Sequence, residues 1–420
     1  MNLNSISRFM LSSLISSSIL LILAASPAVG YTLQIFGNAN MDGTIDELDI
    51  TALEGMIGGS VAKTELADAD ADGDGDLDDG DLDRLREIIR GDPAEIALID
   101  SAGRVVTVDA PVSRIVPLHM RHATAVVVLG GEDAIVGVGR TVLERESLFP
   151  ELADKPSIGS HAEPDLEATL ELSPDLVIAF TQTGGQDQLE EKLPPEVALV
   201  RIDLSRADNL KEEMMLLGTL IGKKDAASAY DEWYDLYVGT VTDRVADIPE
   251  EDRMRAFLER ESPEREASTR WAYAGDTGYS DLCDVAGGAN IAKGKIEYHG
   301  DVEAEWVMEA NPEVIIGLSY GGGYAVDDDS RLKAYRDGIM KAPGFAFVDA
   351  VRDGRVYVIS GDFSLGPQMT IGAVVVAKWL YPDLFADLDP QEIHREFLRE
   401  FMGVDPEIAG EGAFVYPPFD

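Results

Sequence analysis

The chain has 420 residues, enough for more than one domain, and carries 78 Asp and Glu against 34 Lys and Arg, a formal net charge of −44. A chain this acidic repels polyanions, which excludes nucleic acid as a partner. The single cysteine, Cys283, excludes an internal disulfide and is expected to be a small buried residue.

Residues 1–30 have the pattern of a signal peptide. Arg8 precedes an apolar stretch over residues 9–25, and Ala28-Val29-Gly30 supplies the small residues that a signal peptidase accepts. A retained membrane anchor is the alternative, disfavoured because the strongly apolar core is short and is followed by Pro27. The mature chain is therefore predicted to be secreted, extracellular or at the cell surface.

A twelve-residue pattern occurs twice, over residues 38–49 and 70–81. Each copy places oxygen side chains at alternate positions and a glycine, Gly43 or Gly75, at the sixth, where the chain must turn sharply. Calcium takes six to eight oxygen ligands, so the repeat predicts two Ca²⁺ ions. The predicted ligands are Asn38, Asn40, Asp42, Thr44, Asp46 and Asp49 in the first copy and Asp70, Asp72, Asp74, Asp76, Asp78 and Asp81 in the second.

A helical pattern follows each loop, but no long helix precedes it and Asp replaces the Glu that ends a helix-loop-helix calcium hand. Loop then helix, twice, resembles a dockerin, which implies a cohesin-like domain or cell-surface scaffold as partner. In dockerins the residues that recognise the partner lie near loop positions 10 and 11, which are Glu47-Leu48 in the first copy and Asp79-Gly80 in the second. Because the two pairs differ from each other, the type of partner and dual-mode docking stay open. A solvated acidic linker is the alternative, disfavoured by two copies in register. We call residues 31–94 the N-terminal module.

From residue 95 short β-rich runs alternate with helical patterns. Residues 96–100 and 104–108 are predicted to form a hairpin around Ala102-Gly103. Such alternation favours a parallel sheet covered on both faces. The further strands are predicted at residues 114–118, 135–138 and 175–179, and a helix at 123–129.

Short strings recur in one order through this region. They are Asp100 to Arg104, Ser113 to Val116, Leu129 to Val138 and Leu172 to Ile178, then Asp284 to Asn290, Asn311 to Ile316 and Ala350 to Val358. Over residues 95–403 the chain resembles the substrate-binding proteins of ABC importers for iron siderophores, haem and cobalamin. That resemblance implies two lobes joined by one rigid helix, with a ligand cleft between them.

The predicted fold is therefore α/β, with two Rossmann-like lobes joined by a long helix and preceded by a small α-helical calcium-loop domain. Tyr230, Trp233 and Tyr234 belong to an apolar stripe along the joining helix, which we expect to pack in the core. The predicted parts are a signal peptide (1–30), the N-terminal module (31–94), an N-lobe (95–222), the bridging helix (223–247), a C-lobe (248–408) and a tail (409–420).

Ligands of an open parallel sheet bind beyond the carboxyl ends of its strands. The residues there include arginines for an anionic chelate, aromatic rings for stacking and imidazoles for a metal. His394, on a helix over residues 390–401, is expected at the surface with no special role. The candidate ligand-binding residues are His119, Arg121, His122, Arg140, His161, Thr181, Trp271, Tyr273, Tyr279, His299, Tyr320, Tyr324, Asp362 and Phe363.

The resemblance to importer binding proteins also implies one acid per lobe that docks onto arginines of a membrane permease. Glu167 and Glu305 stand at equivalent places in the two halves. Each is also an acid near a helix N-terminus, where the helix dipole favours it without any partner.

The sequence predicts a binding protein that captures a metal chelate, such as a ferric siderophore, haem or a cobalamin-like molecule, for an ABC permease. Calcium-dependent docking would hold it at the surface. A surface adhesion protein with a ligand-free binding fold is the alternative. A metallocofactor enzyme of related fold is disfavoured, because such enzymes need several cysteine ligands and the chain has one, and no GxSxG, HExxH or P-loop occurs.

Overall fold

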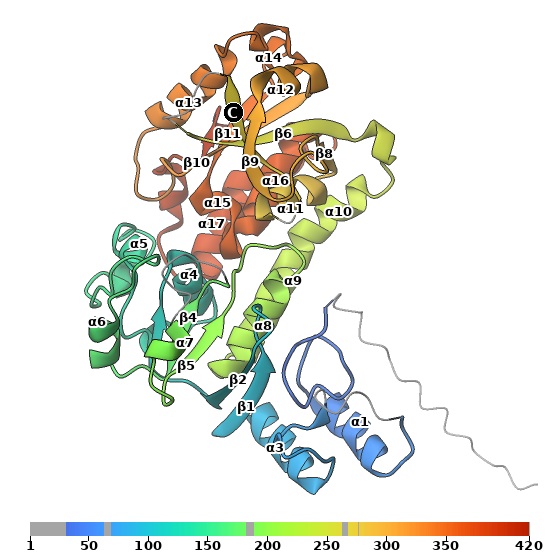
Figure 1. Ribbon diagram of the computed structural model, residues 1–420, viewed down its shortest axis with the longest axis vertical. Coiled ribbons are helices and arrows are strands. Elements are labelled where there is room, and N and C mark those ends of the chain that lie inside the picture. Colours follow the sequence, from blue (N-terminus) through green and yellow to red (C-terminus); the bar gives the residue numbers. More distant parts are fainter. Residues whose placement is uncertain (1–30, 63–68, 182–188, 263–267, 276, 420) are drawn as a thin grey trace, which may run out of the picture.

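The computed structural model describes residues 31–62, 69–181, 189–262, 268–275 and 277–419 (Figure 1). The predicted signal peptide lies outside these residues. Among the described helices, none combines the length and the apolar character that a membrane span requires.

The N-terminal module contains two loops, each followed by a helix: α1 (Glu47–Ile57) and α3 (Asp79–Arg90). The loops themselves start the helices. Asp46 caps α1 by accepting from the backbone N–H of Leu48, and the Asp49 carboxylate accepts from the Asp46 N–H at 2.9 Å. Asp78 and Asp81 form the same capping box on α3. Acids at loop positions 9 and 12 thus satisfy backbone donors that the first helical turn leaves open.

The predicted hairpin is confirmed as β1 (Ala94–Ile99) and β2 (Val105–Ala110), paired antiparallel. The chain segment 34–36 of the N-terminal module adds to its free edge. The N–H of Phe36 donates to Ala97 O and the N–H of Ile99 donates to Gln34 O, both at 2.9 Å. The module and the hairpin therefore share backbone hydrogen bonds.

The N-lobe is built on a parallel sheet of β3 (Ile115–Pro117), β4 (Leu176–Ala179) and β5 (Ala198–Arg201), in that order. The strand predicted at residues 135–138 is wrong: Val136 N–H bonds Ile115 O whereas Val138 N–H bonds Pro156 O, so two partners share the segment and no ladder forms. The helices of this lobe are α4 (Met120–Val128), α5 (Arg140–Leu143), α6 (Leu166–Glu171), α7 (Leu189–Lys192) and α8 (Leu210–Leu220).

A nearly continuous helix leads from the N-lobe to the C-lobe (Figure 1). It consists of α9 (Lys224–Tyr234), a π-helical turn (Asp235–Gly239) and α10 (Thr240–Val245). Tyr230, Trp233 and Tyr234 are buried along it, as the aromatic stripe predicts. Trp233 packs against two rings of α17 (Pro390–Glu400) and its C-cap, with centroids 5.6 Å from Phe397 and 5.3 Å from Phe401.

The C-lobe sheet is mixed rather than parallel. Its order is β12-β11-β10-β6-β7-β9, with β8 beside β6, and β7, β9 and β12 run antiparallel to their neighbours. The predicted tail contains β12, so it belongs to this sheet. The strands are β6 (Met254–Arg260), β7 (Thr269–Tyr273), β8 (Gly288–Asn290), β9 (His299–Glu303), β10 (Val314–Ser319), β11 (Val356–Ser360) and β12 (Val415–Tyr416).

Helices cover the C-lobe sheet, and α16 among them is almost wholly buried. Cys283 on α11 is buried as predicted. The expectation for His394 is wrong: its side chain is buried and its Nε2 lies 2.6 Å from the Tyr324 hydroxyl. Besides α17, these helices are α11 (Gly278–Val285), α12 (Ala304–Ala310), α13 (Ser330–Met340), α14 (Asp349–Arg352), α15 (Gly361–Ser364) and α16 (Met369–Leu380).

Candidate ligand-binding site

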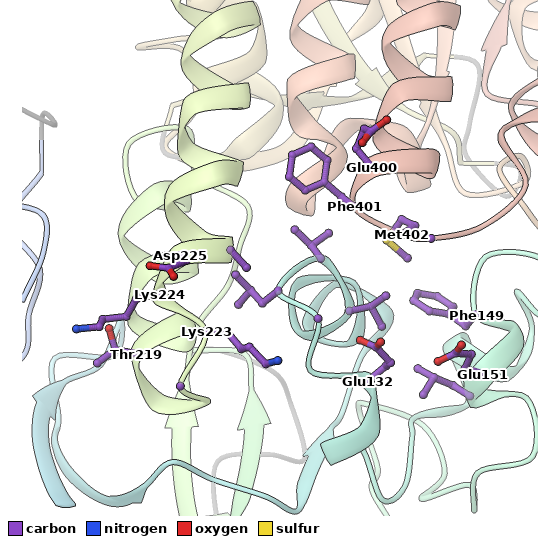
Figure 2. A pocket seen from close by; sticks show the side chains of 18 of the residues that line it. Glu132, Phe149, Glu151, Thr219, Lys223, Lys224, Asp225, Glu400, Phe401 and Met402 are labelled. Carbon is purple, nitrogen blue, oxygen red and sulfur yellow. The ribbon is translucent and has the colours of Figure 1, made fainter. Parts of the chain in front are cut away.

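A cavity of about 660 Å³ lies between the two lobes, within the range of small-molecule sites. A larger one, about 720 Å³, lies where the N-terminal module, α4, the α8–α9 turn and the end of α17 meet (Figure 2). Only the first stands at strand ends, so we take it as the candidate site. Its lining residues are Arg121, His161, Phe180, Thr181, Asp203, Ser205, Arg206, Thr277, Gly278, Tyr298 and His299.

The N-lobe wall of this cleft presents a cation above aromatic rings. α4 starts directly after β3, and His119 caps it by accepting from the Arg121 N–H at 3.2 Å. The Arg121 guanidinium lies 5.1 Å from the centroid of Phe180, a cation–π distance. The His119 and His161 rings meet edge to face at 4.8 Å. Burial lowers the pKa of both imidazoles, so the positive charge here comes from arginine.

The C-lobe wall is aromatic. The rings of Trp271 and His299 stack with centroids 5.2 Å apart, and Tyr273 meets His299 at 6.0 Å. Tyr298 lines the cavity and is half exposed. Nearby, the Arg260 guanidinium lies 5.2 Å from the Tyr320 ring. A ligand in this cleft would therefore meet charge on one side and flat apolar surface on the other.

Ion pairs between the lobes flank the cleft. Arg145 Nε and a terminal guanidinium nitrogen donate to the two carboxylate oxygens of Asp362 at 2.6 and 2.7 Å. Arg206 Nε donates to Asp281 at 2.5 Å. Gly278 approaches the N-lobe so closely that a Cβ there would collide with the carbonyl oxygen of Ser205. The lobes are thus in contact in this structure, with the cavity between them.

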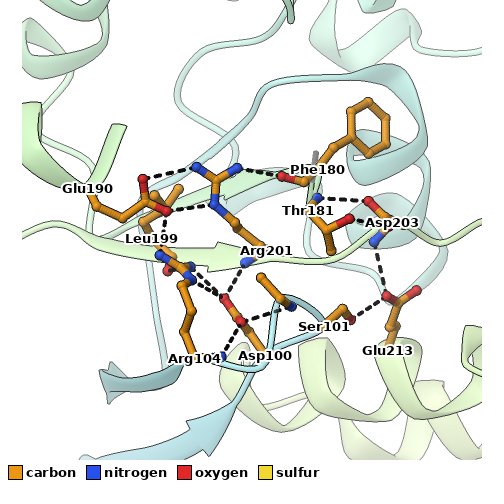
Figure 3. A network of polar contacts seen from close by, with 11 residues as sticks. Asp100, Ser101, Arg104, Phe180, Thr181, Glu190, Leu199, Arg201, Asp203 and Glu213 are labelled. Carbon is orange, nitrogen blue, oxygen red and sulfur yellow. Dashed lines mark hydrogen bonds and ion pairs between the residues drawn. The ribbon is translucent and has the colours of Figure 1, made fainter. Parts of the chain in front are cut away.

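A polar network fixes the N-lobe loops behind this wall (Figure 3). Asp203 accepts from the Thr181 N–H at 2.8 Å and from its hydroxyl at 2.6 Å. Glu213 in turn accepts from the Asp203 N–H at 3.0 Å and from the Ser101 hydroxyl at 2.5 Å. Arg201 donates to Phe180 O at 2.6 Å. The Thr181 hydroxyl proton is therefore already donated to Asp203.

The structure places four candidates, Arg121, His161, Thr181 and His299, in the cavity lining, with His119, Trp271, Tyr273 and Tyr320 beside it. The remaining six lie elsewhere for identifiable reasons. Four of them are buried in side-chain packing: His122, Tyr279, Tyr324 and Phe363. Asp362 forms the interlobe ion pair with Arg145, and Arg140 is exposed beside Glu144.

Sequence reasoning missed Asp203, Ser205 and Arg206, which line the cavity after β5. The signal that could have found them is the short run Ala198–Arg201, whose aliphatic residues end in a charged one. Residues after this run stand beyond the carboxyl end of a parallel strand, the same criterion that selected the other candidates. His122 was misplaced because its Nε2 lies 2.9 Å from Ile202 O inside the lobe, where burial lowers its pKa to about 3.

The second twelve-residue loop brings carboxylates together as a cation site requires. Asp70, Asp72 and Asp74 each offer an oxygen within 4.8 Å of the others. In the first loop Asp49 is fully buried, and that burial raises its pKa to about 7; burial also raises the pKa of Asp81 in the second. Both carboxylates accept backbone N–H groups, Asp49 from Asn40 and Asp46 and Asp81 from Asp78. Oxygen-only side chains of this kind fit Ca²⁺.

The two acids predicted to dock a permease are exposed on separate lobes (Figure 1). Glu167 lies in the first turn of α6 and Glu305 in the first turn of α12. Neither carboxylate forms an ion pair with another residue that the structure describes.

The sequence matches the family model of periplasmic binding proteins over residues 115–362, more than half of the chain. The molybdate-binding protein MolA of Haemophilus influenzae is 24% identical over 343 residues, 73% of this chain and 91% of MolA. The TroA-like periplasmic binding protein FepB of Veillonella parvula shares the fold, with a TM-score of 0.62, 22% identity, and coverage of 76% of this chain and 98% of FepB. Helicobacter pylori CeuE with Ni(II) bound aligns with a TM-score of 0.60 and 16% identity, over 74% of this chain and 98% of CeuE. These are binding proteins, in agreement with the prediction that the chain is no enzyme.

Proposed function

The chain belongs to the periplasmic binding protein family, and from that premise we propose that it captures an anionic metal chelate between its lobes and delivers it to an ABC permease. The chelate is a ferric siderophore, haem or a cobalamin-like molecule. The observation that carries the proposal is the cleft itself: Arg121 lines it, with its guanidinium over the Phe180 ring, in a chain of net charge −44.

The two walls suit two parts of such a ligand. Arginine binds carboxylate and other anionic oxygens through several N–H donors at once, and Arg121 stands where an anionic group would enter. The stacked Trp271 and His299 offer flat surface to the organic part, and imidazoles from both lobes line the cavity for the metal.

A bare oxyanion is the second candidate, because the relative MolA is a molybdate-binding protein. Arginine serves an oxyanion equally well. The cavity of about 660 Å³ is larger than one tetrahedral oxyanion fills, which favours the chelate.

A binding panel separates these candidates. The mature chain is titrated with ferric siderophores, haemin, cobalamin and molybdate, with calorimetry, visible absorbance and Trp fluorescence as readouts. We expect one chelate class to bind, and Arg121→Gln to weaken it about 10- to 100-fold, the range for loss of a charged hydrogen bond. The matched control is Arg399→Gln, an exposed arginine on α17 paired with Glu400. Molybdate binding alone favours the second candidate, and binding of nothing contradicts both.

Delivery to the permease is proposed to use Glu167 and Glu305, since paired charges on the two lobes would set the register on a two-subunit partner. Charge reversal of both acids to Arg should lower uptake in cells at least tenfold without changing ligand affinity. Glu171→Arg and Glu309→Arg, exposed on the same two helices, are the controls. Unchanged uptake would remove this assignment.

The N-terminal module is proposed to bind two Ca²⁺ ions through the twelve loop residues named above and to dock, as a dockerin, on a cohesin-like domain or cell-surface scaffold. Such docking keeps a secreted binding protein near its permease. Calorimetry should give two calcium ions per chain, and a chelator should release the protein from the cell surface. Retention that is indifferent to chelator would contradict the tether while leaving ligand capture intact.

A further inference from the structure

The first calcium loop is hydrogen-bonded to the strand by which the N-terminal module joins the N-lobe. The side-chain amide of Asn38, the first predicted ligand, donates to Leu33 O at 2.8 Å and to Asp42 O at 2.7 Å. Residues 34–36 then pair with β1, as described above. A shift of Asn38 would therefore displace Leu33 and the residues next to it that pair with the edge of the hairpin.

The same loop is bound to the bridging helix. Lys224 Nζ, at the start of α9, donates to Ile45 O in the first loop at 3.2 Å and to Ile89 O near the end of α3 at 3.4 Å. Both Lys223 and Lys224 line the 720 Å³ cavity, and Figure 2 shows their amino groups directed to opposite sides. Two turns along α9, Asp231 accepts from the Tyr31 hydroxyl at 2.9 Å.

From the hairpin the contacts continue to the ligand cleft (Figure 3). The β1–β2 turn binds β5 through Ser101 N–H to Arg201 O at 3.0 Å, and the Ser101 hydroxyl binds Glu213. Glu213 accepts from the N–H of Leu204 at 2.6 Å as well as from that of Asp203. Asp203 accepts from Thr181, so hydrogen bonds joined by short stretches of backbone link the first loop to the cavity lining.

We propose that the calcium loops serve the ligand cleft as well as surface attachment: cation binding to the first loop stabilises the N-lobe wall through the hairpin and through Lys224 on the bridging helix together, and thereby raises ligand affinity. This inference rests on the proposed calcium binding. Because linkage is reciprocal, ligand must tighten calcium by the same factor. Couplings of this kind are typically about 5- to 150-fold in affinity. Calcium outside the cell would then favour capture, and its loss would favour release.

Calcium alone is a sufficient probe. Calorimetry measures binding to the full mature chain, and hydrogen exchange follows residues 94–110 and 198–205 with calcium and with chelator. We expect calcium to slow exchange in both segments at least fivefold. Lys224→Met should keep calcium binding but reduce the effect on residues 198–205. Lys223→Met is the control, because the Lys223 amino group is directed to the opposite side from that of Lys224; it should respond as wild type. Tyr31→Phe, which removes only a hydroxyl, replaces Lys224→Met if that variant does not fold.

Each outcome decides something. Calcium binding that leaves exchange in both segments unchanged overturns the inference while the proposed calcium site stands. A Lys224→Met response equal to wild type overturns the route through the bridging helix and with it the inference as stated. Absence of calcium binding removes the inference together with the proposed calcium site.

Discussion

The junction between the N-terminal module and the N-lobe differs from the junction between the two lobes in the kind of polar contact that each has beside its apolar core. At the first, backbone hydrogen bonds join residues 34–36 to β1, and Leu98 and Ile35 are buried in a shared apolar core. At the second, the apolar core is also continuous and Gly366 N–H donates to Leu204 O at 2.8 Å, but the side-chain ion pairs Arg145–Asp362 and Arg206–Asp281 are added. Strand-like backbone pairing holds one geometry, whereas ion pairs exchange with water when surfaces part. We therefore expect the module to move with the N-lobe and the lobes to open.

The largest effect should come from breaking the first junction. Leu98→Ala removes a fully buried side chain from the strand that the module pairs with, and should lower the free energy of unfolding by about 4 kcal/mol. Urea unfolding measures the loss. Val105→Ala, on the exposed side of the same hairpin, should cost less than about 1 kcal/mol. Equal losses would mean that the junction is not packed as described.

The second effect concerns the lobe junction. Asp362→Asn leaves the Arg145 guanidinium without its carboxylate in a nearly buried place, which should disfavour the closed state by about 3 kcal/mol. Small-angle scattering of the ligand-free chain should then report a larger radius of gyration. The double variant Arg145→Met/Asp362→Leu should recover most of the compactness, because it leaves no unpaired charge. An unchanged radius in Asp362→Asn would show that other contacts close the lobes.

The pH dependence of the first junction should be smaller. Burial raises the pKa of Glu213, which binds the hairpin turn, to about 7. The folded state therefore holds a proton that the unfolded state releases near pH 4.5, so this contribution is greatest at low pH and is lost as pH rises through 7. Between pH 5 and 7 it amounts to about 2 kcal/mol. Unfolding of wild type and Glu213→Gln at both pH values isolates it. The exposed Glu171→Gln is the control, and equal pH slopes for wild type and Glu213→Gln would refute the assignment.

The smallest effect sharpens the contact between module and bridging helix. Tyr31→Phe removes the hydrogen bond to Asp231 and should lower the free energy of unfolding by about 1 kcal/mol. The matched control is Tyr298→Phe, a half-exposed tyrosine in the cleft, which should leave unfolding unchanged. A larger loss in the control than in Tyr31→Phe would contradict this contact.

Local patterns predicted what local physics controls. The twelve-residue repeat located both acid-lined loops, because the same residue types recur at the same positions in each copy. The hairpin and the strands at 115–117 and 176–179 followed from runs of β-branched residues between turns. Arg121, His161 and Thr181 were found in the cleft because residues after parallel strands meet at one sheet edge.

The sequence by itself thus determined the repeat, the order of elements and the strand-end candidates, since these depend on spacing along the chain. Tertiary structure alone decided that Asp362 pairs with Arg145, that His394 is buried against Tyr324, and that Lys224 binds carbonyl oxygens of the first loop and of α3. Each of these pairs joins residues 70 or more positions apart. No local pattern encodes such partners, because burial and charge pairing are settled only when distant elements pack together.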